Sequence, residues 1–149
     1  MTDIDTELLL NDILKRLFHK ILRLQEKSVS EAANQNISRS EIHVLEAVQD
    51  VGEATLTGIA AELSVSKPTV SVCVKRLVEK GYLKKAASKS DGRKNIISLT
   101  KKGEACCLKH KQFHDAMIHS ILNDFKIEQY PELLKALHSL HGFFDRLDA

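Results

Sequence analysis

Residues 64–103 read SVSKPTVSVCVKRLVEKGYLKKAASKSDGRKNIISLTKKG, and this stretch decides the fold. It holds eleven lysines and arginines against two acids, so its net charge is +9. The rest of the 149-residue chain must therefore carry −7, because the total is +2. We call residues 64–103 the basic segment. Charge segregated in this way presents one basic face to a polyanion, and an order of helix, turn, helix and hairpin makes nucleic acid the leading candidate.

The first half of the basic segment predicts a helix from Ser66, an N-cap candidate, to the terminator Gly81. Its apolar positions gather on one inner face, which consists of Val70, Val74, Leu77 and Val78. The opposite face offers hydroxyls, cations and one valine, Val72, which could touch a thymine methyl in a major groove or simply be a tolerated surface residue. The residues that we expect to contact DNA on this helix are Ser66, Lys67, Pro68, Thr69, Ser71, Val72, Lys75 and Arg76.

The second half of the basic segment predicts a hairpin of two short strands, 82–86 and 95–99, joined by a turn containing Asp-Gly. Three cations cluster at its tip: Lys89, Arg93 and Lys94. A cationic ribbon beside a helix–turn–helix can enter a minor groove or follow phosphates, whereas the alternative is a solvated charged loop. We expect Asp91 to be structural and to hold the turn through Arg93 or through a turn amide.

The flanking sequence predicts further helices. A helical pattern covers residues 5 to about 34, and a capping-box spacing between Ser38 and Glu41 starts a second helix that ends near Val51. Thr55 opens a short third helix. After the hairpin, one helix runs from Thr100 to about Phe125, and a last one starts at Glu128 or Pro131 and ends near Leu147. The expected fold is mainly α, in the order ααααββαα, with a DNA-binding domain at 37–102 between helical parts at 1–36 and 103–149.

The first and last helices carry apolar stripes that a small domain cannot bury alone. The first stripe is Leu10, Ile13, Leu17, Ile21 and Leu24, and the last is Leu133, Leu137, Leu140, Phe144 and Leu147. Pairing of such stripes between two copies predicts a two-fold homodimer. Two copies of the 66–81 helix would then lie about 34–36 Å apart, which requires a pseudo-palindromic site on double-stranded DNA.

Composition excludes several other classes. Hydrophobic residues make up 43% of the chain, enough for a core, and no apolar run reaches the length of a membrane span. The acidic N-terminus is the reverse of a secretory signal, and Cys73, Cys106 and Cys107 show no CxxC spacing. We therefore expect a soluble cytoplasmic protein. No phosphate loop, nucleophile elbow or HExxH motif is present, so an enzyme is the weakest option.

Two stretches carry a family resemblance. Residues 56–83, LTGIAAELSVSKPTVSVCVKRLVEKGYL, and 88–103, SKSDGRKNIISLTKKG, resemble the winged helix–turn–helix of MarR-type transcriptional regulators. The Asp91-x-Arg93 pair followed by Leu99-Thr100-x-x-Gly103 is characteristic of that family. The resemblance covers roughly residues 38–125 and implies a homodimeric DNA-binding regulator that acts as a repressor.

A narrower resemblance concerns residues 99–122, LTKKGEACCLKHKQFHDAMIHSIL. They are similar to the branch that represses fatty-acid biosynthesis genes in Gram-positive bacteria. That resemblance implies acyl-carrier protein bearing a long acyl chain as co-repressor. An apolar effector pocket between the long helices and the winged domain would be lined by Leu17, Ile21, Val44, Phe113, Met117 and Ile121. A stripe of this kind is more often core than ligand site, so the acyl-chain interpretation comes from the resemblance.

Two alternatives stay open. The side chains of Cys107, His110 and His114 share one helix face, and with His43 they form a chemically reasonable zinc set. Zinc-responsive members of the MarR family use similar histidines, but Lys109 stands where they have an acidic ligand, so metal binding is not favoured. The second alternative, of another class, is a winged-helix protein–protein adaptor that never touches DNA.

Overall fold

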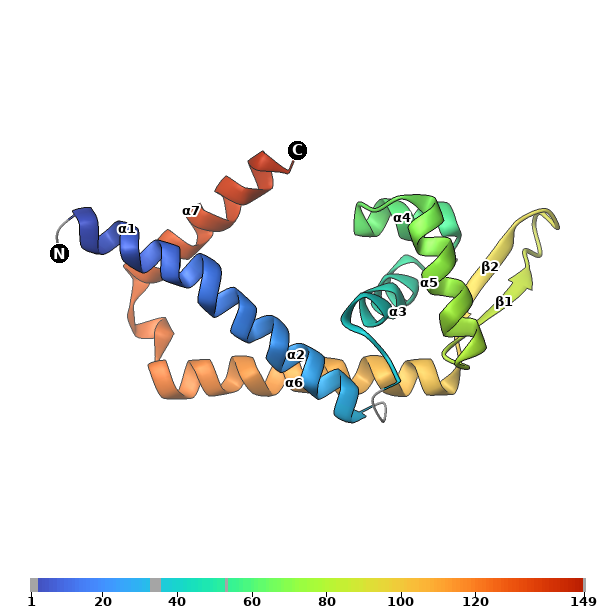
Figure 1. Ribbon diagram of the computed structural model, residues 1–149, viewed down its shortest axis with the longest axis horizontal. Helices are drawn as coiled ribbons and strands as arrows, with labels where there is room; N and C mark the ends of the chain where they lie inside the picture. The colour runs from blue at the N-terminus through green and yellow to red at the C-terminus, as the bar shows by residue number, and fades with distance from the viewer. Residues whose placement is uncertain (1–2, 33–35, 53, 149) are drawn as a thin grey trace. The chain divides into compact units, whose positions relative to one another are not determined.

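The computed structural model describes residues 3–32, 36–52 and 54–148. The chain divides into two compact units, residues 1–111 and 112–149. The mainly helical class with one small antiparallel hairpin is confirmed (Figure 1). The elements in chain order are α1 (Asp3–Asp12), a π-helical turn η1 (Ile13–Leu17), α2 (Phe18–Ala32), α3 (Arg39–Val51), α4 (Leu56–Leu63), α5 (Lys67–Glu79), β1 (Leu83–Ala87), β2 (Asn95–Leu99), α6 (Lys101–Phe125), a 3₁₀ turn η2 (Ile127–Gln129) and α7 (Pro131–Leu147).

The first helical run was predicted as one helix, but it contains a π-helical turn at Ile13–Leu17. Such a turn adds one residue to the helical repeat, and the apolar periodicity gave no sign of it. The described part of the run ends at Ala32, and residues 33–35 lie outside the described residues. Large apolar side chains of this run stay exposed: Leu8, Leu9, Leu10, Leu14, Leu17, Phe18 and Leu24.

Helix α3 begins at the capping box that its sequence predicted. The Ser38 Oγ accepts a hydrogen bond from the Glu41 N–H at 3.2 Å, and the Ser38 N–H donates to Glu41 Oε2 at 2.9 Å. Both bonds satisfy backbone donors that a helix start leaves unpaired. The helix stops at Gly52, whose φ of 80° lies in the left-handed region that favours glycine. Its inner face is buried as expected.

A single core joins α3, α4, α5 and the hairpin. Thr55 caps α4 by accepting the Gly58 N–H at 3.1 Å, and Ser66 caps α5, as the sequence predicted. The left-handed Gly81 follows the end of α5, so the predicted helix termination is confirmed. The largest fully buried side chains of this core are Ile42, Leu45, Ile59, Val70, Val74, Leu77, Tyr82, Leu83 and Ile97.

The hairpin lies close to where the sequence placed it. Its strands pair antiparallel from Leu83 opposite Leu99 to Ala87 opposite Asn95. The first strand starts one residue later than predicted because the Tyr82 N–H closes the end of α5 on the Leu77 carbonyl, at 2.9 Å. The sequence missed a further pairing, in which the Ile97 N–H donates to the Ala54 carbonyl at 2.7 Å. That bond ties β2 to the residue just before the cap of α4.

The last helix, α7, starts at Pro131, the second of the two predicted starts, because Glu128 lies in the short η2 turn. Its apolar stripe is exposed within the described chain, with side-chain exposures between 41% and 67%. The residues of this stripe are Leu133, Leu137, Leu140, Phe144 and Leu147. An exposed stripe of this length is an unsatisfied packing surface.

Candidate nucleic-acid interface

Helix α5 separates an inner and an outer face as its sequence predicted. Val70, Val74 and Leu77 point into the core with at most 1% exposure, whereas Lys75 and Arg76 are exposed. Val72 is 53% exposed on the outer face. The outer face therefore offers two cations and one methyl-bearing side chain to solvent, and these are groups that can contact phosphates, base edges and thymine methyls.

The first turn of α5 carries a cap that occupies two of the predicted contact residues. The Ser66 Oγ accepts the Thr69 N–H at 3.3 Å and lies 2.7 Å from the Thr69 Oγ1. Both side chains remain exposed, so their hydroxyls support the helix start while facing outward. Lys67 and Pro68 are also exposed, and Ser71 is half-buried.

The hairpin tip is held by short-range hydrogen bonds. Asp91 accepts the Arg93 N–H on its Oδ1 at 3.1 Å, so its expected structural role at a turn amide is confirmed. The Lys94 N–H donates to the Asp91 carbonyl at 3.0 Å, and the Ser88 N–H donates to the Lys94 carbonyl at 2.7 Å. Lys89, Arg93 and Lys94 are exposed. The tip is thus a fixed turn that carries three exposed cations.

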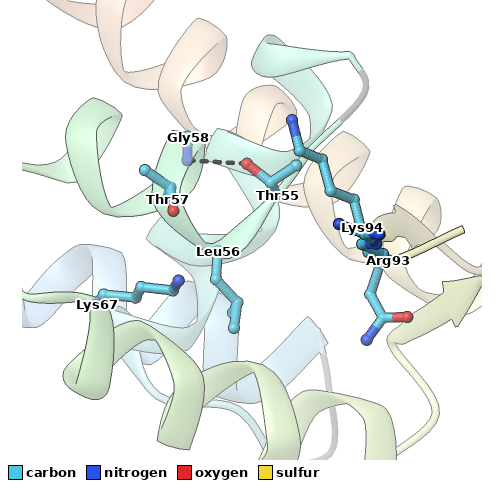
Figure 2. Close-up of a pocket in the computed structure, with 8 residues that line it drawn as sticks. Thr55, Leu56, Thr57, Gly58, Lys67, Arg93 and Lys94 are labelled. Carbon is cyan, nitrogen blue, oxygen red and sulfur yellow. Dashed lines mark hydrogen bonds between the residues drawn. The ribbon is translucent and has the colours of Figure 1, made fainter. Parts of the chain in front are cut away.

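The hairpin and α5 meet across a cavity of about 520 Å³. Figure 2 shows Lys67 on one side of it, Arg93 and Lys94 on the other, and the first turn of α4 between them. The sequence predicted the three cations as contact residues but missed the rest of the lining: Thr55, Leu56, Thr57, Gly58 and Asn95. The missing signal is the Ala54–Ile97 pairing, because it is non-local and brings β2 to the start of α4. Cations from two segments that are distant in the sequence thus line the same cavity.

The histidines that could have held zinc lie in different surroundings. His110 is buried, and its Nδ1 lies 2.5 Å from Glu46 Oε1 of α3. His43 lines a separate crevice of about 200 Å³ with Thr69 and Cys73. Across residues 3–32, 36–52 and 54–148, no three His, Cys, Asp or Glu side chains are placed to hold a metal ion. The zinc alternative rested on His43, Cys107, His110 and His114, of which His114 belongs to the second unit, and it stays a prediction that the sequence does not favour.

The three cysteines are free thiols in packed surroundings. Burial raises the pKa of Cys73 and of Cys106, and it raises the pKa of Cys107 to about 12. Protonated, buried thiols react slowly, since the thiolate is the nucleophile. These residues act as small apolar packing groups, as the sequence suggested for Cys73.

The residues expected to line an effector pocket are spread over several elements. Val44 is 4% exposed in the winged core. Leu17 belongs to η1 and Ile21 to α2, whereas Phe113, Met117 and Ile121 belong to the part of α6 in the second unit. The pocket itself therefore stays a prediction. None of the described helices is long and apolar enough to span a membrane.

Comparison with known proteins identifies the winged domain. Residues 35–94 match the model of the MarR family. The HTH-type transcriptional regulator YhjH of Bacillus subtilis (strain 168) is 26% identical over 76% of this chain, and the match spans 65% of that protein's own length. The structure of Streptococcus pneumoniae FabT in complex with DNA is similar with a TM-score of 0.85 and 28% identity, over 95% of this chain and 99% of that chain.

A second solved structure shows the same fold. A mutant of S. aureus MepR bound to an oligodeoxyribonucleotide is similar with a TM-score of 0.62 and 23% identity, over 83% of this chain and 95% of that chain. The relative YhjH and the matched family are described as transcriptional regulators. Residues 35–94 thus match the MarR family, and the likeness to FabT extends along nearly the whole chain.

Proposed function

We propose that the chain is a sequence-specific DNA-binding transcriptional regulator that acts as a repressor and as a homodimer. One observation carries this proposal: the outer face of α5 and the hairpin tip both present exposed cations, and the two elements frame one cavity. Among the described residues, five of these cations form no ion pair with an acid: Lys67, Lys75, Lys89, Arg93 and Lys94. Phosphates of a duplex would supply the missing partners.

The two elements would read DNA in different ways. We assign α5 to the major groove, where Arg76 and Lys75 meet base edges or phosphates and Val72 meets a thymine methyl. We assign the hairpin tip, with Lys89, Arg93 and Lys94, to the adjacent minor groove or its phosphates. Residues 37–102 are the DNA-binding part of this proposal.

The homodimer is proposed from the exposed apolar stripes of the helical parts 1–36 and 103–149. Soluble monomers rarely leave such long apolar faces uncovered, and a second copy offers the same stripe for two-fold pairing. A two-fold dimer would present α5 twice, about 34–36 Å apart, to the two halves of a pseudo-palindromic operator.

For the regulated genes, we propose fatty-acid biosynthesis, with acyl-carrier protein bearing a long acyl chain as co-repressor. The support is the likeness to FabT, at 28% identity over 95% of this chain. The acyl chain would enter among Leu17, Ile21, Val44, Phe113, Met117 and Ile121.

Mobility shifts test both levels of the proposal. The probes are the DNA upstream of the chain's own gene and a set of fatty-acid synthesis promoters, each with and without acylated carrier protein. DNA binding that falls steeply with salt supports the proposed DNA-binding regulator. Enhancement of that binding by acylated carrier protein supports the proposed control of fatty-acid biosynthesis genes. A winged-helix adaptor would bind none of these duplexes in a salt-dependent way. DNA binding that acylated carrier protein does not enhance would refute the proposed co-repressor but not the proposed DNA-binding function.

A further inference from the structure

The Glu41 carboxylate holds two helix ends together in the winged domain. Its Oε1 and Oε2 accept hydrogen bonds from the Lys80 ammonium at 2.9 and 2.8 Å. Oε2 also accepts the Ser38 N–H that closes the capping box of α3. The Glu41 side chain is 7% exposed and that of Lys80 is 29% exposed. One buried carboxylate therefore joins the start of α3 to the end of α5.

Lys80 is the C-cap residue of α5, so the ion pair acts directly on the position of that helix. The Lys80 N–H donates to the Arg76 carbonyl at 2.9 Å. Its own carbonyl accepts the Lys102 ammonium of α6 at 2.9 Å, and that ammonium lies 4.3 Å from the centre of the Tyr82 ring. The end of α5 is thus fastened on one side to α3 and on the other to the start of α6.

We infer that the Glu41–Lys80 ion pair positions α5 for reading DNA, so that Glu41 is a positioning residue for operator recognition. The inference rests on the proposed DNA-binding function. A contact to a base edge requires its side chain to be placed accurately along the groove, and the pair fixes the end of α5 one turn beyond Arg76. Lys80 then counts among the cations of the basic segment without serving as a phosphate contact.

Glu41→Gln separates the ion pair from the cap. Glutamine can accept the Ser38 N–H in a capping box as glutamate does, but it carries no charge to hold Lys80. The matched control is Glu79→Gln, which removes a carboxylate from the exposed face at the end of the same helix. Both variants raise the net charge by one, so simple electrostatics predicts tighter DNA binding for both.

The positioning role predicts opposite signs for the two variants. The probe is the duplex enriched from a random pool by the wild-type chain, with a scrambled duplex of the same length as the non-specific reference. Glu41→Gln weakens enriched-duplex binding by about tenfold, the order of one lost base contact, while its scrambled-duplex binding is at least as tight as that of the wild type. Glu79→Gln binds both duplexes at least as tightly as the wild type. A Glu41→Gln chain that behaves like Glu79→Gln overturns the inference.

Lys80 provides the second test through the salt dependence of binding. Lys80→Met weakens enriched-duplex binding but keeps the slope of log affinity against log salt, whereas Lys75→Met lowers that slope by about 1. Lys80→Arg keeps the ion pair and retains wild-type affinity. A slope lowered equally by Lys80→Met and Lys75→Met would make Lys80 a phosphate contact and refute the positioning role. Circular dichroism at the assay temperature checks that each variant is folded. If Glu41→Gln is unfolded, the comparison of Lys80→Met with Lys80→Arg decides whether the inference holds.

The test also separates this inference from the proposed function. If the wild-type chain enriches no sequence and shows no salt-dependent binding, the DNA-binding proposal fails and the positioning role fails with it. If the wild type binds and enriches a sequence while Glu41→Gln and Lys80→Met match it, only the positioning role fails.

Discussion

The backbone carbonyl of Tyr82 lies directly against Gly103, where the base of the hairpin meets the first turn of α6. A methyl group at position 103 would overlap this carbonyl oxygen and would stand 3.2 Å from the Leu99 Cδ2. The carbonyl cannot easily withdraw, because it accepts the Thr100 N–H at 3.0 Å. Thr100 in turn accepts the Gly103 N–H at 3.2 Å and donates its hydroxyl to the Gly81 carbonyl at 2.6 Å. Thr100 therefore links Gly81 to Gly103 through hydrogen bonds, and position 103 has room only for glycine.

Gly103→Ala should lower the free energy of unfolding by about 1–3 kcal/mol, the usual cost of forcing an extra carbon into a packed site. Chemical denaturation followed by circular dichroism measures the change. Gly92→Ala is the control, because a methyl there meets nothing within 4 Å. Equal free energies of unfolding for the two variants would show that the structure accommodates a methyl group at position 103 without loss of stability.

Arg76→Ala should weaken binding to the chain's own upstream DNA and lower the salt slope by up to about 1, as expected for a lost phosphate or base contact. Fluorescence anisotropy across a salt series measures both effects. Lys135→Ala on α7 is the control, since it also removes one exposed positive charge but lies outside the basic segment. If both variants lower affinity by the same factor, net charge rather than the α5 face would explain the binding.

Leu137→Asp should convert the proposed dimer to a monomer, because a carboxylate in the middle of the α7 stripe cannot be buried against a second copy without a partner. Leu137 is 45% exposed within the single chain, so the substitution leaves the monomer fold intact. Sedimentation at micromolar concentration distinguishes the two states. Ser139→Asp adds the same charge on another side of α7 and should stay dimeric; a dimeric Leu137→Asp chain would assign dimerisation to another surface.

Cys107 should make stability fall as pH rises above its ordinary pKa of 9.0. Burial raises the pKa of the folded thiol to about 12, so between these values the unfolded chain loses a proton that the folded chain keeps. The free energy of unfolding then decreases by up to about 1.4 kcal/mol per pH unit in this window. Denaturation of the wild type and of Cys107→Ala from pH 8 to 10.5 isolates this residue, because the wild type should show the steeper decline. Parallel pH dependences would mean that the folded thiol ionises normally.

Local signals in the sequence predicted much of the fold. Ser38, Thr55 and Ser66 cap α3, α4 and α5, respectively. A cap is a hydrogen bond between residues three apart, so its residue types are visible in a short window. The inner face of α5 was predictable for the same reason, because helical periodicity alone places Val70, Val74 and Leu77 on one side.

Features set by distant partners were not predictable. Lys80 counted as one of eleven cations, but its carboxylate partner Glu41 stands 39 positions away in the sequence. His110 shares a helix face with other metal-binding residue types, yet the structure gives it Glu46 of α3 as a neighbour. Spacing along one helix predicts the face on which a residue lies, but the contacts of its side chain depend on how the other helices pack.

The extra residue in the η1 turn changes which leucines share one face of the first helical run. It rotates Leu8, Leu9 and Leu10 by about 100° about the helix axis relative to Leu24, compared with an uninterrupted α-helix. In the proposed homodimer, this one turn would therefore determine which leucines face a second copy.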